Sequence, residues 1–339
     1  MRSSLAARLL LTLGLVCGLT LGIYATNSYA GDLFDVLKRM SDADQKKNYQ
    51  GTFILRKSDN LSTLRVTHGV DDEGVWESLE ALNGEPRKIL RHNNRVISIY
   101  PGRELVTIRH TSKNQSLHQQ LPDNLDQLET YYSISRLNDD RVADQQTLVI
   151  ELKPKDTYRY GYRYWIDENS GMLLRCDLVT EDNRIVEQMM FTSVNYLSQA
   201  PVQAFDLERY QGYRQQVMDE QVLPVPQDEA QRWKVNNLPA GFMLNHSAMR
   251  YSQLAAIHKN NSSPEAHPDL LHLAYSDGLA SVSIFIELNL NEADHMKGAS
   301  SMGAVNAFGQ PVDGYFVTVV GEVPLKTVQS MAQSIVLLP

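Results

Sequence analysis

The segment Thr157–Asp167, TYRYGYRYWID, carries the clearest strand pattern in the sequence. Its side chains alternate between two faces, as they do along a β-strand. One face holds Tyr158, Tyr160, Tyr162, Tyr164 and Ile166, and the other holds Arg159, Arg163 and Trp165. The pattern predicts either a tyrosine-rich core face with a basic solvent face, or a half-open sheet whose aromatic side lines an apolar cavity beside arginines that could hold anionic groups.

Alternating segments on both sides extend this strand into a sheet. The segments are TFILR, STLRVTH, GVWESLEAL, RVISIY and ELVTI before it, then QTLVIEL beside it and MLLRCDLV and RIVEQMMFTSV after it. Turn sequences such as HNN, YPGR, DENSG and TEDN separate them, which indicates an antiparallel meander. A short helix precedes the meander: Asp32 can cap it, and Leu33, Phe34, Leu37 and Met40 recur at helical spacing.

The strand pattern stops near Pro201, and the composition changes soon after. Residues 31–230 hold 56 charged side chains in 200, whereas 231–339 hold 14 in 109. We therefore expect a first domain over 31–205, a linker over 206–230 that contains Pro224 and Pro226, and a second domain over 231–339. Sparse charge on the second domain indicates either a surface buried against something or a polar, uncharged surface.

The second domain is predicted to be α+β, with strands at HLAY, ASVSIFIEL and YFVTVVG. A helix beginning at Pro324 would place Leu325, Val328, Met331, Ala332 and Ile335 on one face. The peptide SDGL joins the first two strands. It could be the corner of a catalytic site around Ser276, but no feature places a base near that hydroxyl, and Asp-Gly between strands is a strong hairpin signal.

The first thirty residues have the features of a secretory signal sequence. Arg2 and Arg8 precede an apolar run from Leu9 to about Ala25, and Ser28-Tyr29-Ala30 supplies small residues for cleavage. An uncleaved membrane anchor is the alternative. Removal of 1–30 leaves 30 basic and 40 acidic residues, a poor composition for nucleic-acid binding. Only Cys176 then remains, which excludes an internal disulfide and is typical of a buried core thiol.

No motif in the sequence points to catalysis. The patterns G-x-S-x-G, H-E-x-x-H, the phosphate-binding P-loop and G-x-G-x-x-G are all absent. His267 and His272 are the nearest notable histidine pair, but no third ligand accompanies them. We therefore expect no catalytic residues, no metal site and no cofactor, and a binding protein in place of an enzyme.

Several further motifs resemble one family. They are NYQGTF at Asn48–Phe53, the strand end Tyr164–Asp167, Trp233 followed by LPAGF, then YSDGL, and VTVVGEVP at Val317–Pro324. Together they resemble the RseB/MucB family of periplasmic negative regulators of the sigma-E (AlgU-type) stress response. The resemblance covers essentially the whole mature chain. RVADQQT departs from it, because the family commonly has glycine after Arg-Val-Ala.

The resemblance implies a first domain similar to LolA and LolB, an unclosed antiparallel β-barrel around helices. It implies a periplasmic protein whose second domain binds the periplasmic part of a transmembrane anti-sigma factor (RseA/MucA-like). Binding would shield that segment from site-one proteolysis, and lipopolysaccharide or another amphiphile would release it. Whether the protein forms a homodimer is left open. A periplasmic lipid or lipoprotein carrier is the alternative function, and an uncharacterised hydrolase is a third.

The candidate site residues follow from the two predicted domains. The expected lipid-facing residues are Phe53, Leu55, Leu64, Val66, Tyr160, Tyr162 and Tyr164, with Arg159 and Arg163 as head-group contacts, although the opposite sheet face could be the buried one. The expected partner contacts are Tyr275, Leu279, Phe285 and Glu322, of which Tyr275 and Phe285 could equally be core residues.

Overall fold

The computed structural model describes residues 28–72, 74–110, 127–201, 207–218, 225, 230–250, 270–288 and 295–339. Residues 1–27 of the expected signal sequence, His267 of the histidine pair, and Pro224 and Pro226 of the expected linker lie outside these ranges. Within them, none of the helices combines the length and the hydropathy that a membrane span requires.

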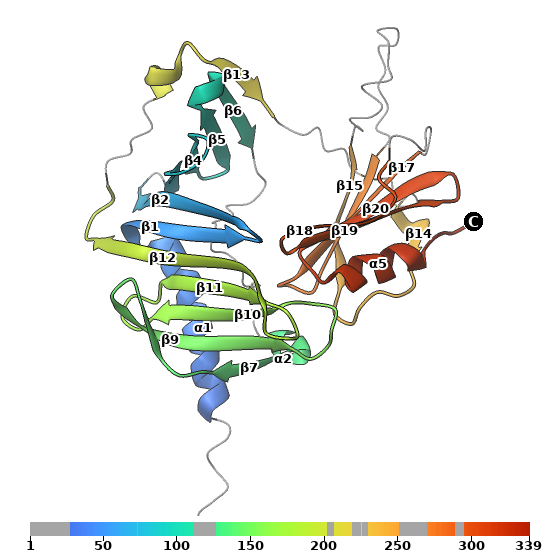
Figure 1. Ribbon diagram of the computed structural model, residues 1–339, viewed down its shortest axis with the longest axis horizontal. Helices are drawn as coiled ribbons and strands as arrows, with labels where there is room; N and C mark the ends of the chain where they lie inside the picture. The colour runs from blue at the N-terminus through green and yellow to red at the C-terminus, as the bar shows by residue number, and fades with distance from the viewer. Residues whose placement is uncertain are drawn as a thin grey trace, which may run out of the picture.

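Thirteen strands form one large, unclosed sheet (Figure 1). In chain order they are β1 Asn48–Lys57, β2 Asn60–Asp71, β3 Gly74–Ala81, β4 Lys88–His92, β5 Arg95–Tyr100, β6 Leu105–His110, β7 Tyr132–Arg136, β8 Asp140–Val142, β9 Gln145–Pro154, β10 Gly161–Asp167, β11 Leu173–Val179, β12 Ile185–Leu197 and β13 Arg214–Val217. Their order in space is β13-β6-β5-β4-β3-β2-β1-β12-β11-β10-β9-β7, with β8 paired to β9. The predicted unclosed sheet is confirmed, and its strands pair antiparallel except for β13 with β6.

The turns of this sheet lie where the sequence placed them. Residues with positive φ occur in three of the predicted turn peptides: Asn93 in HNN (φ 50°), Asn183 in TEDN (φ 61°) and Gly171 in DENSG (φ 78°). Asparagine and glycine tolerate this left-handed backbone, which a tight connection requires. Local turn chemistry therefore sets the register of the meander.

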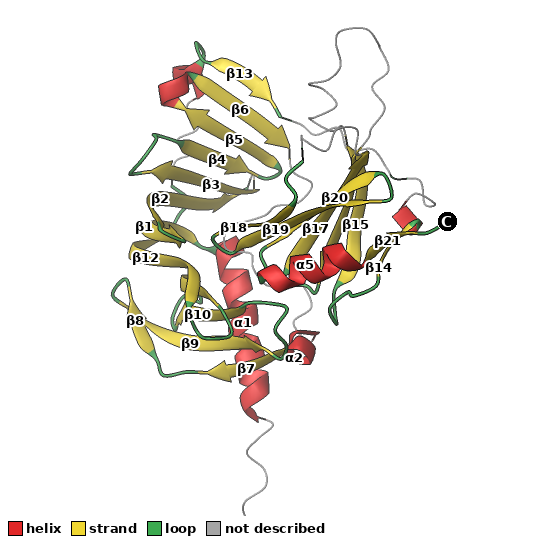
Figure 2. Cartoon of the chain, turned by 45° about the vertical axis from the view of Figure 1, so that its right-hand side comes forward, coloured by secondary structure: helices red, strands yellow, loops and turns green. Residues whose placement is uncertain are grey.

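Helix α1, Ser28–Lys46, crosses one face of the large sheet (Figure 2). It begins four residues before Asp32, the expected cap. Val36, Leu37 and Met40 pack with Ile150 and Tyr164 in one buried cluster. This packing fills part of the inner face. Shorter helical turns are η1 Pro101–Arg103, α2 Leu128–Tyr131 and η3 Leu207–Tyr210.

A six-stranded antiparallel sheet, the second sheet, follows in the chain. Its order is β15-β16-β17-β20-β19-β18. The strands are β15 Met243–Arg250, β16 Leu270–Ser276, β17 Ser281–Leu288, β18 Gly298–Met302, β19 Val305–Val312 and β20 Tyr315–Gly321. Helix α5, Leu325–Ser334, covers one face of it, and the short pair β14 Trp233–Val235 and β21 Ile335–Leu337 lies beside the helix. The predicted helix face is buried at Val328, Met331 and Ala332, and Ile335, which was expected in the helix, is buried as the first residue of β21.

Two expectations about the elements need correction. The tyrosine-rich strand begins at Gly161, so Tyr158, Arg159 and Tyr160 precede it, although Tyr160 still packs in the same buried cluster as Tyr162 and Tyr164. A side chain at position 161 would approach the Leu152 carbonyl oxygen at 3.1 Å, so the strand starts where glycine permits close pairing. The expected linker also contributes β13, which pairs in parallel with β6. Alternation did not identify β4, β7 or β8 in the large sheet, or β15, β18 and β19 in the second sheet.

We predict that Leu37→Ala lowers the free energy of unfolding by about 2–5 kcal/mol, because Leu37 is fully buried between α1 and the sheet. Lys38→Ala, at an exposed position of the same helix, is the control and should change stability little. Urea denaturation measures both. Equal effects of the two changes would contradict the packing of α1 described above.

Candidate binding cavity and the contacts between the sheets

A cavity of about 240 Å³ opens on the inner face of the large sheet. Its walls are mostly apolar side chains from seven strands of the sheet, and Glu322, the residue after β20, joins them. The lining residues are Phe53, Leu55, Lys57, Leu64, Leu79, Arg87, Ile89, Tyr162, Leu173, Cys176, Leu178, Glu187, Gln188, Met189 and Glu322. An apolar cleft with a few polar groups is the usual form of a small-molecule site.

The structure brings four of the expected lipid-facing residues to this cavity: Phe53, Leu55, Leu64 and Tyr162. Val66 and Tyr164 are fully buried beside it and do not line it. Tyr160 lies at the boundary with the second sheet, where its hydroxyl accepts a hydrogen bond from Asn306 Nδ2 at 3.1 Å. The cavity therefore lies on the face of the sheet to which Tyr162 of β10 points. Strand parity in the sequence had not decided which face lines the cavity.

The thiol of Cys176 lines the same cavity. Cys176 is buried, and burial raises its pKa far above the ordinary value, so the thiol stays protonated. A protonated, buried thiol acts as a small apolar side chain and not as a nucleophile. The predicted core role of Cys176 is confirmed.

One end of the cavity is polar and joins the two sheets. Glu187 Oε2 lies 2.9 Å from Lys57 Nζ, and Glu187 Oε1 accepts a hydrogen bond at 3.3 Å from the backbone N–H of Ala304, in the turn between β18 and β19. Burial raises the pKa of Glu322, and the charge of Glu187 raises it further, while Lys57 opposes both. This end of the cavity thus depends on residues of the second sheet.

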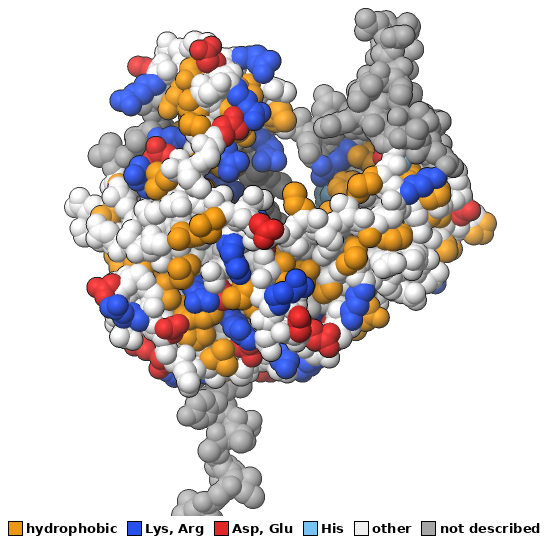
Figure 3. Space-filling view, in the orientation of Figure 1, with side chains coloured by type: hydrophobic (Ala, Val, Ile, Leu, Met, Phe, Trp, Pro, Cys, Tyr) orange, Lys and Arg blue, Asp and Glu red, His pale blue; other side chains and the backbone are white. Residues whose placement is uncertain are grey.

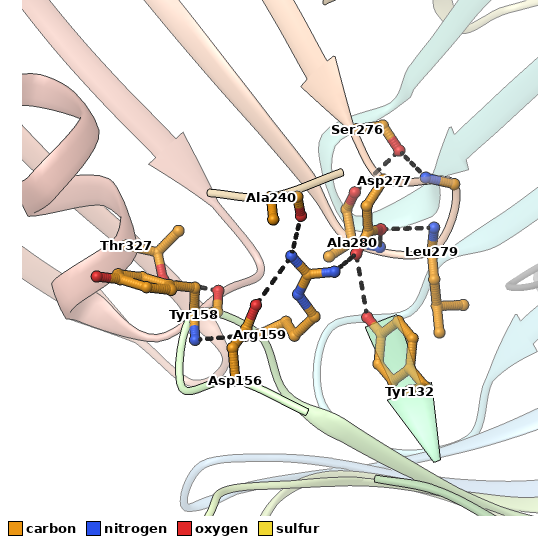
Figure 4. A network of polar contacts seen from close by, with 11 residues as sticks. Tyr132, Asp156, Tyr158, Arg159, Ala240, Ser276, Asp277, Leu279, Ala280 and Thr327 are labelled. Atoms are coloured by element: carbon orange, nitrogen blue, oxygen red, sulfur yellow. Dashed lines mark hydrogen bonds and ion pairs between the residues drawn. The ribbon is translucent and has the colours of Figure 1, made fainter. Parts of the chain in front are cut away.

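A buried ion pair joins the two sheets (Figure 4). Arg159 Nη1 lies 2.7 Å from Asp277 Oδ2, and both side chains are fully excluded from solvent. Arg159 Nη2 donates to the Ala240 carbonyl oxygen at 2.6 Å and lies 3.2 Å from Asp156. Charges removed from water must be paired and hydrogen-bonded. The Arg159 guanidinium therefore has a structural role.

Aromatic side chains surround the ion pair. The Arg159 guanidinium lies 5.0 Å from the ring centre of Tyr131 and 5.1 Å from that of Phe242. Tyr132 donates a hydrogen bond to Asp277 at 3.4 Å, and burial together with the Asp277 charge raises the pKa of this phenol. Gly241 has φ +88°, and a Cβ there would meet the Tyr131 ring at 2.3 Å, so only glycine fits this close approach.

Two further contacts join the sheets beside α5. Thr327 Oγ1 donates to the Tyr158 carbonyl oxygen at 2.7 Å, and Lys326 lies over the Tyr158 ring. Ala304 and Leu279 pack into the apolar cluster of the large sheet.

An open groove of about 780 Å³ runs along the boundary between the two sheets, lined by residues that include Arg56, Arg184 and Lys326. The space-filling view shows basic side chains of both sheets on this side of the molecule (Figure 3).

The peptide SDGL is the predicted hairpin turn and also holds Asp277. Strands β16 and β17 pair antiparallel on either side of it, and Gly278 has φ +101°. Ser276 Oγ accepts from the Gly278 N–H and donates to the Ala280 carbonyl oxygen, so the hydroxyl is used in the turn. Asp277 Oδ1 accepts the N–H groups of Leu279 and Ala280, which leaves Oδ2 for Arg159.

The expected head-group arginines require correction. Arg159 lies in the buried ion pair and lines no part of the apolar cavity. Arg163 projects from the opposite face of β10 and pairs with Glu151 at 2.7 Å and with Asn183. The arginine that does line the cavity is Arg87, just before β4. The sequence analysis did not select Arg87, because it predicted no strand at Lys88–His92, the segment that Arg87 precedes.

The four expected partner contacts occupy different environments. Tyr275 lies in the core of the second sheet, Leu279 packs against the large sheet, and Glu322 lines the cavity. Phe285 is half-buried, with its ring stacked on His272 at 4.6 Å between centroids. His272 also contacts Ser283 Oγ, and no cluster of three potential metal ligands occurs among the described residues. Of the four, Tyr275 is buried, whereas Leu279, Phe285 and Glu322 are partly exposed.

Models of two related domains match the chain. The MucB/RseB N-terminal domain matches residues 32–209, and the MucB/RseB C-terminal domain matches residues 227–336. The chain belongs to the MucB/RseB family. The sigma factor AlgU regulatory protein MucB of Pseudomonas aeruginosa is 30% identical over 328 residues, 95% of each chain. The sigma-E factor regulatory protein RseB of Escherichia coli K12 is 26% identical over 308 residues, 88% of this chain and 89% of RseB.

Solved structures of family members have the same architecture. MucB in the Pseudomonas aeruginosa MucA/MucB complex superposes with a TM-score of 0.66 at 28% identity, over 91% of this chain and 99% of that one. A crystal structure of MucB gives a TM-score of 0.57 at 27% identity, over 91% and 98%. The MucB/RseB architecture therefore extends over both sheets of this protein.

We predict that Arg159→Ala lowers the free energy of unfolding by about 3–5 kcal/mol, because it leaves Asp277 buried without its counter-charge. Arg65→Ala breaks the exposed pair of Arg65 with Glu80 and should cost about 0–1 kcal/mol. Urea denaturation of the two variants makes the comparison. A loss for Arg159→Ala no larger than for Arg65→Ala would show that the buried pair does not stabilise the fold.

We predict that Glu322→Gln stabilises the protein in a pH-dependent manner. The folded-state pKa of Glu322 is raised above its ordinary value of 4.5, so its contribution is fully present below that value and is lost as the pH rises through the raised pKa. The Gln variant should therefore melt above the wild type at about pH 8, and the difference should vanish at about pH 4. Thermal denaturation at both pH values tests this, with exposed Glu168→Gln as control. The same difference at both pH values would exclude Glu322 as the titrating group.

Proposed function

We propose that the protein is a periplasmic regulator that binds the periplasmic part of a membrane anti-sigma factor, shields it from site-one proteolysis and so represses the sigma-E response. The observation that carries this proposal is the likeness, over 91% of the chain, to MucB as it occurs in the MucA/MucB complex. A second solved structure, of MucB in complex with MucA(peri), covers 90% of this chain at a TM-score of 0.65. The curated relatives are named as sigma-factor regulatory proteins.

The proposed activity needs binding surfaces and no catalytic group. A protein that covers a cleavage site acts by occupancy, and its effect is removed when a second ligand favours a different state. The apolar cavity supports an amphiphile such as lipopolysaccharide as that second ligand, because one end of the cavity is built from Glu187 and from Glu322 of the second sheet. Ligand binding there would change the contacts between the sheets.

A periplasmic lipid or lipoprotein carrier is the second candidate, and the same cavity favours it. A carrier requires the cavity and an exit, but it has no need of a second sheet fixed by a buried ion pair. Binding of the anti-sigma segment separates the two functions. The likeness of the large sheet to LolA and LolB remains a prediction from the sequence.

We predict that a molar excess of the protein slows cleavage of the anti-sigma periplasmic segment by its site-one protease, because the bound segment is inaccessible. Added lipopolysaccharide should restore cleavage. The measurement is the rate of segment loss on gels with protein, with protein plus lipopolysaccharide, and with neither. A lipopolysaccharide arm without the protein controls for direct effects on the protease. Equal rates with and without the protein would rule out shielding, and binding of lipid without binding of the segment would favour the carrier.

A further inference from the structure

The cavity is small compared with a whole amphiphile. Its volume of about 240 Å³ lies below the roughly 300–1,000 Å³ of pockets that enclose drug-sized ligands. A methylene group is close in size to a water molecule, which takes about 30 Å³ in the liquid. The cavity therefore accepts about eight such groups, which corresponds to one short acyl chain and not to several.

The charges on the cavity wall orient such a chain. Glu187 and Glu322 lie at the end that meets the second sheet, whereas the exposed Arg87 lines the cavity from the start of β4. Lys57 offsets the charge of Glu187 at that end, so an anionic head group would meet the remaining carboxyl group of Glu322 there and would be attracted by the guanidinium of Arg87. The head then lies at Arg87, and the end of the chain points toward Glu322.

The tip of the β18–β19 hairpin closes the end toward which the chain points. Ala304 is fully buried in the same apolar cluster as Tyr162, Leu173, Cys176 and Leu178, which line the cavity. Its N–H is held by Glu187, and a Cβ on Gly303 would lie 3.1 Å from the same carboxyl oxygen. Methylene groups beyond the capacity of the cavity would be buried on this side only by taking the place of Ala304.

We propose that this cavity takes one acyl chain of an anionic amphiphile, with its head group at Arg87, and that chains longer than the cavity displace the β18–β19 hairpin from the large sheet. The inference rests on the proposed function and assigns to it the step by which a lipid acts. A short chain fills the cavity and leaves the sheets in contact. A long chain gains additional apolar burial only by separating Ala304 and Glu322 from the large sheet.

A reversible crosslink tests the displacement. An ideal Cβ on Gly303 lies 3.8 Å from the backbone N of Ser58, so positions 58 and 303 are near enough for a disulfide between S58C and G303C to be tried. The pair is introduced with Cys176→Ala to remove the buried thiol. The reduced form of the same protein is the matched control, because it carries the same substitutions at two positive-φ positions. Octanoate and palmitate are the probes, with affinities measured by calorimetry.

We expect the reduced protein to bind both fatty acids and the oxidised protein to bind octanoate unchanged. Palmitate affinity should fall about tenfold or more on oxidation, since loss of burial of only two methylene groups accounts for that factor. Unchanged palmitate affinity in the oxidised protein would overturn the proposal. So would an equal loss of octanoate and palmitate, because the effect would then not depend on chain length.

A separate pair of variants tests the assignment of the head group to Arg87. Arg87→Ala should weaken both fatty acids, whereas Arg95→Ala, an exposed arginine outside the cavity, should weaken neither. Equal effects of the two variants would overturn the assignment to Arg87. Binding of the anti-sigma segment is measured on every variant. If the segment binds while neither fatty acid binds the reduced protein, this inference fails and the regulator proposal stands; if the fatty acids bind as expected and the segment does not, the reverse holds.

Discussion

The buried pair of Arg159 and Asp277 is the constraint on which the arrangement of the two sheets depends. Each charge is removed from water, so either residue alone would be unfavourable, and the two are stable only together. The turn that presents Asp277 uses one carboxyl oxygen for its own N–H groups and leaves the other for Arg159. The Asp277 side chain therefore takes part both in the local turn and in the contact between the two sheets.

This docking completes the cavity. The large sheet supplies the apolar walls, but Glu322 comes from the end of β20, and the hairpin tip at Ala304 packs beside the lining residues. A ligand in the cavity and the contact between the sheets therefore occupy adjoining space. Such proximity gives a physical route for coupling between a lipid and a second partner without any catalytic chemistry.

Much of the fold followed from local sequence signals. Period-two alternation identified most long strands, and SDGL identified its hairpin. Phe53, Leu55, Leu64 and Tyr162 were placed correctly toward one face because strand parity fixes side-chain direction. Arg159 was not placed correctly, because its position depends on Asp277, 118 residues away, and on the loop that precedes Gly161. Strand β13 was missed for the same reason: only its pairing with β6 defines it.

The central claim is that lipid and anti-sigma factor favour different arrangements of the two sheets. The most direct measurement is the distance between spin labels at exposed Lys153 on β9 and Gln333 on α5, in the free protein, with palmitate and with the anti-sigma segment. The account predicts that palmitate lengthens the distance and that the segment restores the shorter one when it displaces the lipid. A distance that is the same in all three states would contradict it.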